Sequence, residues 1–374
     1  MQQSMRNVGI KEIAEALNIS IGTVDRALHG RPGISPKTRD MVLEKSREFG
    51  YRPNYAARSL KLNRKFQLAV FLPREYEAFF DAICDGIVQS SHASSDISIE
   101  PHIFRYPRLD DGDQLLLTAH MAESWDACIV APGNPARIEP ILRRMSEAGT
   151  PVFCVATDAP GTGRIAAVTV DAYTSGAIAA ELLSHAVKTS GSVGVVTGEL
   201  STLDHAEKVK GLRDGLSRWA PHLRLPRIVE THEQEKNAYL RTVEMLESSD
   251  RPVAIYVTTA MSGPVLRACA EHGMLGKLCI LTTDLFEELI PYLETGAVIA
   301  TLYQRPTTQG SLIVEQIARY LRQGELERHQ IKLAPHLVMR SNLELFRHDV
   351  SAGRRPRLSN DLRAPSEITR NELR

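Results

Sequence analysis

The side chains between Ser20 and Arg26 have the types and spacing needed to contact a DNA duplex. If this segment is a helix, Arg26 lies one turn beyond Thr23 and close to Gly22. A guanidinium group can donate two hydrogen bonds to one guanine base, whereas Ile21 can only touch a thymine methyl group or pack. Gly22 offers no side chain. Arg26 is therefore the candidate for base recognition, with a phosphate contact as the alternative.

Polar residues around this helix suit contacts that hold the DNA backbone and do not read sequence. The candidates are Ser20, Thr23, Ser35, Lys37 and Thr38. Ser20 and Ser35 also precede apolar helical patterns, so helix capping is their alternative role.

Three helices are predicted to position these residues within a domain at 1–52. The spacing of Ile10, Ile13, Ala14 and Leu17 is typical of one helix face. Asn18 tolerates the left-handed conformation that a tight turn requires. A second helix begins at Ser20, with Val24 and Leu28 pointing inward, and a third spans about 35–49. Residues 53–65 form a linker whose short helical pattern, NYAARSL, has little apolar surface to stabilise it.

Charge is unevenly distributed, although the whole chain has no net charge. Residues 1–65 contain 13 Lys and Arg against 6 Asp and Glu, and the remainder contains 32 against 39. A basic first segment on an acidic body is typical of a nucleic-acid-binding module joined to a larger domain. A solvated basic face is the alternative.

Residues 66–350 alternate β-rich apolar runs with helical patterns. Such alternation predicts an α/β fold with parallel sheets covered by helices, and two lobes fit this length better than one nine-stranded sheet. The predicted strands are 66–72, 97–103, 127–131, 152–156, 192–198, 228–232, 253–259, 278–284 and 298–304. The polar, Arg-rich tail at 351–374 is predicted to be disordered.

The five cysteines show no CxxC spacing, so we expect neither a disulfide framework nor a metal site. No secretory signal or membrane-spanning run is apparent, which predicts a cytoplasmic protein. The motifs of nucleotide, dinucleotide and zinc-dependent enzymes are absent, and no cofactor is expected. Ser201 near Asp204 and His205 invites a hydrolase interpretation, but the spacing matches no known arrangement.

The run IKEIAEALNISIGTVDRALHGRPGISPKTRDMVLEKSREFGYRPNYAARSL, residues 10–60, resembles the N-terminus of the lactose-repressor/galactose-repressor family. This resemblance implies a helix-turn-helix head whose recognition helix enters the major groove. It also implies a linker helix that folds on DNA, with Leu60 inserted into the minor groove and Tyr55 and Arg58 in contact with DNA. Packing of Leu60 on the effector domain is the alternative. Two such heads in a homodimer imply a near-palindromic operator.

The later part is similar to the family's effector domains and to periplasmic sugar-binding proteins, which hold ligand in a cleft between two doubly wound lobes. In such folds ligands lie beyond the carboxyl ends of the strands. The residues that follow the predicted strands, and those that match the family's helix patterns, give the ligand-binding candidates: Arg74, Phe79, Phe80, Asn134, Asp158, His205, Lys208, Met261, Asp284 and Gln304.

The resemblance implies particular roles for several of these positions. Phe79 and Phe80 match a double aromatic that stacks on sugar rings, with core packing as the alternative for one of them. Asp284 matches a ligand or hinge acid, and Gln304 matches a glutamine on the third crossing segment. Lys208 stands where an arginine commonly grips ligand oxygens, and Met261 stands where asparagine is frequent. Asp171 matches a helix cap.

These residues suit a neutral monosaccharide or polyol. The basic side chains of Lys208 and Arg74 would also suit a sugar acid or phosphorylated sugar. The resemblance therefore implies a repressor of a carbohydrate uptake or catabolic operon that a sugar releases from DNA. A sugar-binding protein without this control, or a regulator whose ligand strengthens DNA binding, is the alternative.

Overall fold

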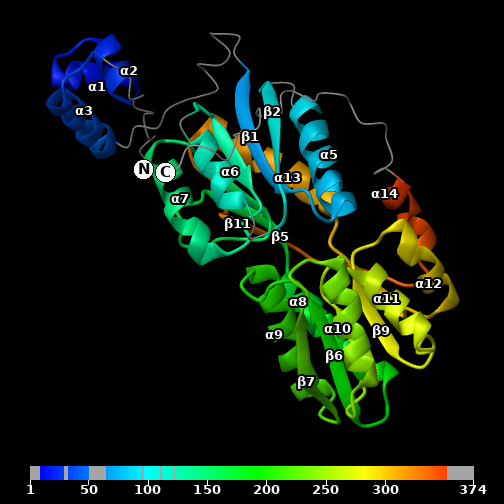
Figure 1. Cartoon of the computed structure of the whole chain (residues 1–374). Coiled ribbons are helices and arrows are strands. Elements are labelled where there is room, and N and C mark those ends of the chain that lie inside the picture. The colour runs from blue at the N-terminus through cyan, green and yellow to red at the C-terminus, as the bar shows by residue number, and fades with distance from the viewer. Residues whose placement is uncertain are drawn as a thin grey trace, which may run out of the picture.

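The computed structural model describes residues 9–28, 33–49, 65–93, 97–109, 112–121 and 123–351. Beyond a helical head, the chain forms two α/β lobes, each built on a six-stranded sheet (Figure 1). The predicted two-lobed architecture is confirmed, and the single nine-stranded sheet is excluded. Tyr55, Arg58 and Leu60 lie outside the described residues, as do nearly all of the predicted linker and tail.

The head consists of α1 (Ile10–Leu17), α2 (Ile21–Leu28) and α3 (Pro36–Glu48). Its small core contains Ile13, Val24 and Val42, which are fully buried. Asn18 ends α1 in the left-handed conformation, with φ 51°. The predicted turn between the first two helices is therefore confirmed.

Both predicted serine caps are present in the head. The Ser20 hydroxyl accepts a hydrogen bond from the Thr23 backbone N at 3.1 Å, and the Ser35 hydroxyl accepts one from the Thr38 backbone N at 3.1 Å. Each serine satisfies a backbone donor that the first helical turn would otherwise leave unpaired.

The first lobe has the strand order β11-β5-β4-β3-β1-β2, with all neighbours parallel. Its central strands are buried along their whole length, as expected for a sheet covered on both faces. The elements are β1 (Phe66–Pro73), α5 (Glu77–Ala93), β2 (Ile99–Tyr106), α6 (Asp113–His120), β3 (Ala127–Val130), α7 (Pro135–Glu147), β4 (Val152–Ala156), β5 (Ala166–Val170), α13 (Pro306–Gln323) and β11 (Gln330–Leu333).

The second lobe has the order β12-β10-β9-β8-β6-β7, in which only the β10–β12 pair is antiparallel. Its elements are α8 (Ala172–Ala186), β6 (Gly191–Thr197), α9 (Leu203–Trp219), β7 (Leu223–Glu230), α10 (Glu235–Glu247), β8 (Ala254–Val257), α11 (Ser262–Glu271), β9 (Cys279–Thr283), η1 (Glu287–Leu289), α12 (Ile290–Thr295), β10 (Ala300–Tyr303), β12 (His336–Val338), η2 (Leu343–Phe346) and α14 (Arg347–Ser351).

The chain crosses between the lobes three times, after β5, after β10 and after β11. At the first crossing the Asp171 carboxylate caps α8 by accepting from the Thr174 backbone N at 3.0 Å, as predicted. Gln304 lies on the second crossing, so its assignment to the third was wrong.

Three strands were missing from the prediction: β5, β11 and β12. β11 and β12 are short and partly exposed, and they exist because the returning chain pairs with β5 in one lobe and with β10 in the other. Pairing between segments so far apart leaves no local pattern in the sequence.

Helices α8 and α9 pack at unusually close range because glycine stands at their contact points. A Cβ atom added to Gly176 would lie 1.9 Å from the carbonyl oxygen of Lys208, and one on Gly211 would lie 2.0 Å from that of Tyr173. This contact sets the position of the α9 backbone at Lys208, whose side chain reaches the space between the lobes.

Gly176→Ala should therefore lower the free energy of unfolding by about 3 kcal/mol or more, because the clash is with backbone that cannot rotate away. Urea unfolding of the purified protein measures this loss. Gly263→Ala is the control, since the nearest atom to its new Cβ lies 3.5 Å away. That variant should stay within about 1 kcal/mol of wild type, and an equal loss in both variants would contradict the close-packing argument.

Candidate functional site

A cavity lies between the lobes at the carboxyl ends of their strands and is partly open to solvent; the space between its walls, open solvent included, is about 430 Å³. The first lobe contributes Tyr76, Phe79, Phe80, Leu109, Ala156 and Thr157 to its lining. The second contributes Thr202, Asp204, His205, Lys208, Thr258, Thr259, Ala260, Asp284 and Gln304. Six of the ten predicted ligand-binding residues thus meet in one place: Phe79, Phe80, His205, Lys208, Asp284 and Gln304.

Lys208 carries a buried positive charge, with only 1% of the residue exposed. Its ammonium group donates to Oδ2 of Asp204 at 2.6 Å, to Oε1 of Gln304 at 3.0 Å and to the Thr258 carbonyl oxygen at 3.2 Å. All three N–H groups of the ammonium have a partner. The charge is therefore compensated within the protein.

Asp284 continues this network on the other side of Gln304. Its Oδ1 accepts from the Gln304 backbone N at 3.0 Å, and its Oδ2 accepts from the Gln304 amide at 2.6 Å. Burial raises the pKa of Asp284 to about 6, because the loss of hydration outweighs the attraction of Lys208 and the two hydrogen bonds. Asp284 thus positions Gln304 at the crossing between the lobes.

The aromatic pair forms the apolar part of the lining. The rings of Phe79 and Phe80 meet edge to face, with centroids 5.0 Å apart, and both side chains are largely buried. Nearby, the Tyr76 hydroxyl is buried without a hydrogen bond among the described residues. Such a wall can cover an apolar ligand face while Tyr76 supplies a polar contact.

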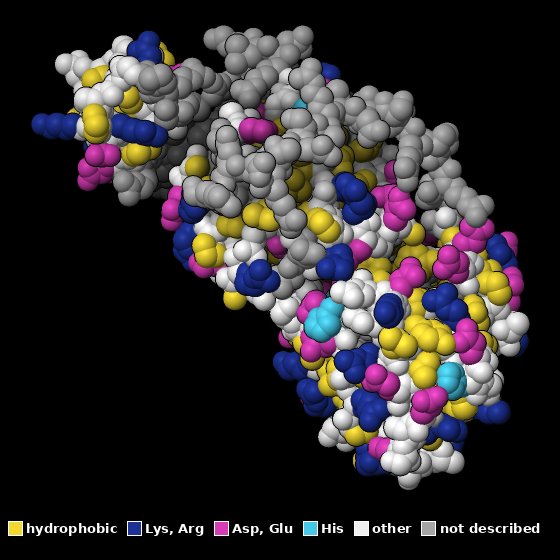
Figure 2. Space-filling model, in the orientation of Figure 1, with side chains coloured by type: hydrophobic (Ala, Val, Ile, Leu, Met, Phe, Trp, Pro, Cys, Tyr) yellow, Lys and Arg dark blue, Asp and Glu magenta, His cyan; other side chains and the backbone are white. Residues whose placement is uncertain are grey.

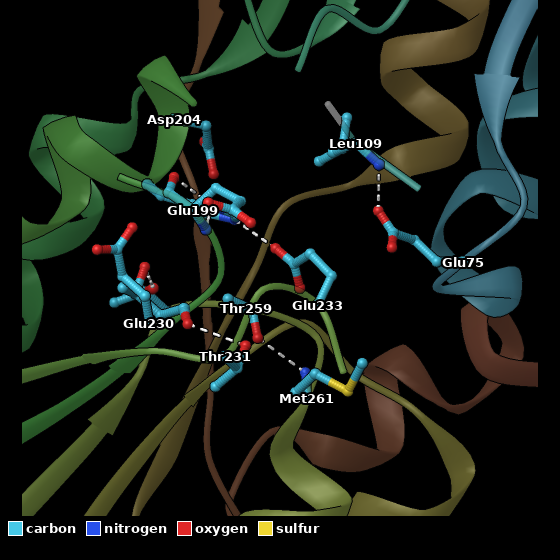
Figure 3. Close-up of polar contacts among 12 residues, drawn as sticks. Glu75, Leu109, Glu199, Asp204, Glu230, Thr231, Glu233, Thr259 and Met261 are labelled. Atoms are coloured by element: carbon cyan, nitrogen blue, oxygen red, sulfur yellow. Dashed lines mark hydrogen bonds and ion pairs between the residues drawn. The ribbon is translucent and has the colours of Figure 1, made fainter. Parts of the chain in front are cut away.

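His205 lies near the start of α9. Its Nδ1 lies 3.1 Å from both the backbone N and the carbonyl oxygen of Glu199, so it accepts from the first or donates to the second according to the tautomer of the ring. Burial lowers the pKa of His205 to about 4, so the ring is neutral at pH 7. Its Nε2 lies 3.5 Å from Oε1 of Glu233 (Figure 3).

Four predicted ligand-binding residues do not line the cavity. Arg74 is exposed after β1. The Asn134 side chain caps α7 by accepting from the backbone N of Ala136 and Arg137. Met261 is partly buried against the second lobe's core, next to Ala260 in the lining.

Asp158 is the fourth. Its two carboxylate oxygens accept from Arg164 at 2.5 and 2.6 Å, and Gln330 donates to Oδ2 at 3.2 Å. The structure therefore gives Asp158 a role in joining the β4 end to β11. A carboxylate with these partners is not directed at a ligand in the cavity.

Sequence reasoning missed several lining residues, among them Asp204, Thr202, Thr157 and Thr258. Asp204 was considered only as a possible hydrolase residue, although it stands four residues before Lys208, a spacing that favours an ion pair on a helix. Asp204 binds Lys208, and His205 forms a hydrogen bond with the Glu199 backbone. Asp204 and His205 therefore both have partners other than Ser201, which is exposed.

The head presents a separate surface. Ile21 is 53% exposed, and Gly22, Arg26 and Lys37 are also exposed. The hydroxyls of Ser20 and Thr23 bond to each other at 2.8 Å, as do those of Ser35 and Thr38 at 2.7 Å. The first turn of α2 therefore faces outward with Arg26 beyond it, which is the arrangement a recognition helix needs.

The described part of the chain contains no group of three or more His, Cys, Asp or Glu residues placed to hold a metal ion. No helix within it is long and apolar enough to cross a membrane. Cys128, Cys154 and Cys269 are buried, while Cys84 and Cys279 are partly buried.

Comparison with family models gives two matches. Residues 9–54 match the model described as bacterial regulatory proteins, lacI family. Residues 68–326 match the model of the periplasmic binding protein domain.

Individual proteins resemble parts of the chain. Catabolite control protein A of Priestia megaterium is 28% identical over 279 residues, covering 72% of this chain and 79% of that protein. The HTH-type transcriptional regulator AglR of Rhizobium meliloti is 44% identical over 66 residues, 18% of each chain. The crystal structure of GanP, a glucose-galactose binding protein from Geobacillus stearothermophilus, aligns with a TM-score of 0.69 at 22% identity and covers 75% of this chain and 99% of its own.

Asp284→Asn should remove part of the pH dependence of stability. The carboxyl keeps its proton up to about pH 6 in the folded protein but loses it near 3.8 when unfolded. The wild-type free energy of unfolding should therefore fall by about 2–3 kcal/mol more than that of the variant as pH rises from 4 to 7. Urea unfolding at four pH values measures the difference. Parallel curves for the two proteins would contradict it, and Asp250→Asn at an exposed ion pair should leave the wild-type slope.

Proposed function

The chain belongs to the periplasmic-binding-protein-domain family and carries a lacI-family regulatory head, and from this premise we propose that it represses a carbohydrate uptake or catabolism operon until a sugar or polyol releases it. One observation carries the proposal. The same chain holds an exposed recognition helix and a cavity that both lobes line with aromatic and hydrogen-bonding groups.

The cavity supports a polyhydroxylated effector. Beside the phenylalanine pair, four lining atoms are buried without a hydrogen bond among the described residues: Oη of Tyr76, Oγ1 of Thr157, Oγ1 of Thr202 and Oδ1 of Asp204. Buried polar groups need partners, and the hydroxyls of a sugar supply them. The similar proteins include a glucose-galactose binding protein, which supports the same class.

A sugar acid or sugar phosphate fits less well. Lys208 already uses its three N–H groups within the protein, and Arg74 lies outside the lining. Of the effectors considered above, a monosaccharide or polyol without an acidic group is therefore favoured.

On DNA, we propose a homodimer that binds a near-palindromic operator, with one α2 helix in each half-site. Arg26 reads a base, while Ser20, Thr23, Ser35, Lys37 and Thr38 contact phosphates. The regulator acts where the bacterial chromosome is, in the cytoplasm. The protein has two arrangements of its lobes, one with higher and one with lower affinity for the operator. The effector shifts the equilibrium between them only as far as it binds the low-affinity arrangement more tightly than the other.

Sugar-induced release from DNA tests the proposal. The purified full-length protein selects its operator from a random duplex library, and fluorescence anisotropy then follows binding with each sugar or polyol of a panel. An effector should weaken operator binding about tenfold or more and should also raise the melting temperature. Tighter operator binding would favour the alternative in which ligand is a co-repressor, and no response to any member would overturn the sugar effector.

Arg26→Ala should relax base preference at one position of each half-site, at a cost of about 1–3 kcal/mol for the preferred base. Binding to a set of single-base operator variants measures this. Lys37→Ala is the comparison, because loss of a phosphate contact weakens all sequences alike and reduces the dependence on salt. A uniform loss for Arg26→Ala would assign Arg26 to the phosphate backbone instead.

A further inference from the structure

The two walls of the cavity differ in chemical character. Four lining residues from the first lobe are apolar and form what we call the apolar wall: Phe79, Phe80, Leu109 and Ala156. The first lobe's other two, Tyr76 and Thr157, carry uncharged hydroxyl groups. The second lobe contributes the lysine, the aspartates and the glutamine of the lining, and Figure 3 shows Leu109 and Asp204 on opposite sides of the space between the lobes. A ligand there meets an apolar wall on one side and a polar wall on the other.

The apolar wall is part of the first lobe's hydrophobic core. Its four residues belong to one cluster of buried side chains, against which Tyr76 also packs. None of the four is more than 9% exposed. Figure 2 shows hydrophobic side chains among charged ones at the narrow region between the lobes. A ligand hydroxyl pressed against such a wall loses its hydration without gaining a hydrogen bond, which weakens binding.

Most polar side chains of the opposite wall are already engaged within the protein. The following have hydrogen-bond partners there: His205, Lys208, Thr258, Thr259, Asp284 and Gln304. The Thr258 hydroxyl, for example, donates to that of Thr197 at 2.7 Å. These bonds hold the polar wall in place and use much of its capacity for hydrogen bonding.

Four oxygen atoms of the lining are left for a ligand. Oη of Tyr76, Oγ1 of Thr157, Oγ1 of Thr202 and Oδ1 of Asp204 are buried without a hydrogen bond among the described residues. Each lobe supplies two of them, so a ligand that bonds to all four joins the lobes. A hexopyranose carries one hydroxyl more than the number of these atoms. Its 6-deoxy counterpart carries four hydroxyls and, in place of the fifth, a methyl group that needs no partner.

We propose that the effector is a 6-deoxyhexose, whose methyl group lies against the apolar wall at Ala156 while its hydroxyls bond to the four oxygens. The proposal rests on the sugar effector argued above and specifies its class. Ala156 has the smallest side chain of the wall, so it leaves the space that a methyl group fills between larger neighbours. Burial of this methyl group stabilises the complex, whereas the hydroxymethyl group of a hexose would bury an oxygen there without a partner.

A matched panel of sugars tests the class of the effector on the full-length protein. Each set contains a 6-deoxyhexose, the hexose of the same ring stereochemistry and the pentose that lacks the sixth carbon. The sets are L-rhamnose with L-mannose and L-lyxose, L-fucose with L-galactose and D-arabinose, D-fucose with D-galactose and L-arabinose, and D-quinovose with D-glucose and D-xylose. Melting temperature identifies binders and calorimetry gives their Kd. At least one 6-deoxyhexose should bind about tenfold or more tightly than both other members of its set.

The outcomes separate this proposal from the proposed function. Equal or tighter binding of a hexose overturns the methyl site and leaves the sugar effector in place. Tightest binding of a pentose does the same, because the space assigned to the methyl group would then be unused. If no member of any set binds, the methyl site is overturned, and the wider panel of sugars and polyols decides separately on the proposed function.

Ala156→Ser tests the place of the methyl group. Ala156 has left-handed backbone, with φ 67°, and serine adds only a hydroxyl to the Cβ atom that this backbone already carries. The new hydroxyl offers a partner to the C6 hydroxyl of a hexose and is itself unpaired beside a methyl group. The preference for the 6-deoxyhexose over its hexose should therefore fall about tenfold, while the Kd of the pentose changes less.

A matched variant controls for the substitution itself. Ala119→Ser adds the same hydroxyl at an exposed position of α6 and should bind every sugar as the wild type does. The melting temperature without ligand shows whether Ala156→Ser is folded. If it is not, Leu109→Gln, which places an amide in the same apolar wall, should reduce the same preference. A folded variant of the wall that keeps the full preference for the 6-deoxyhexose would overturn the methyl site.

Discussion

The buried charge of Lys208 is the interaction on which the cleft depends. An ammonium group that is 1% exposed is tolerated only when the protein supplies every partner. Asp204, Gln304 and the Thr258 carbonyl do so, and Asp284 in turn holds Gln304. These residues come from α9, β8, β9 and the crossing after β10. One buried cation therefore aligns four separate segments of the second lobe and leaves ligand selection to the rest of the lining.

The backbone at the strand ends is strained in the same region. Of the seven described residues other than glycine with positive φ, all but Asn18 end a strand or follow one within three residues. Three of these six, Tyr76, Ala156 and Asp284, line the cavity. Such conformations cost of order 1–3 kcal/mol each, and the close-packed sheets behind them supply the rigidity that maintains them.

What the sequence predicts well here is local. Asn18, Ser20 and Asp171 were recognised because a cap or turn depends on a few neighbouring residues. The two-lobed fold followed from the alternation of strands and helices. The lining of the cleft was harder to predict. Asp158 and Asp284 both follow a strand, but the carboxylate of Asp158 accepts a hydrogen bond from Arg164, whereas that of Asp284 accepts one from Gln304. The burial of Glu233 was missed because it arises from packing against Gly198 and His205, which lie some 30 residues earlier in the chain and leave no local pattern.

The packing within the first lobe explains how the cleft can influence DNA binding. A Cβ atom on Gly86 of α5 would lie 2.1 Å from the Thr307 carbonyl oxygen, and one on Gly310 of α13 would lie 2.1 Å from that of Ile83. Helix α5 begins beside the phenylalanine pair, and α13 directly follows the crossing at Gln304. These helices are too tightly interlocked to slide, so in the proposed mechanism the first lobe would move as a rigid body. Because β1 follows residues 53–65 in the chain, such a movement would shift the point at which the chain leaves the lobe toward the head.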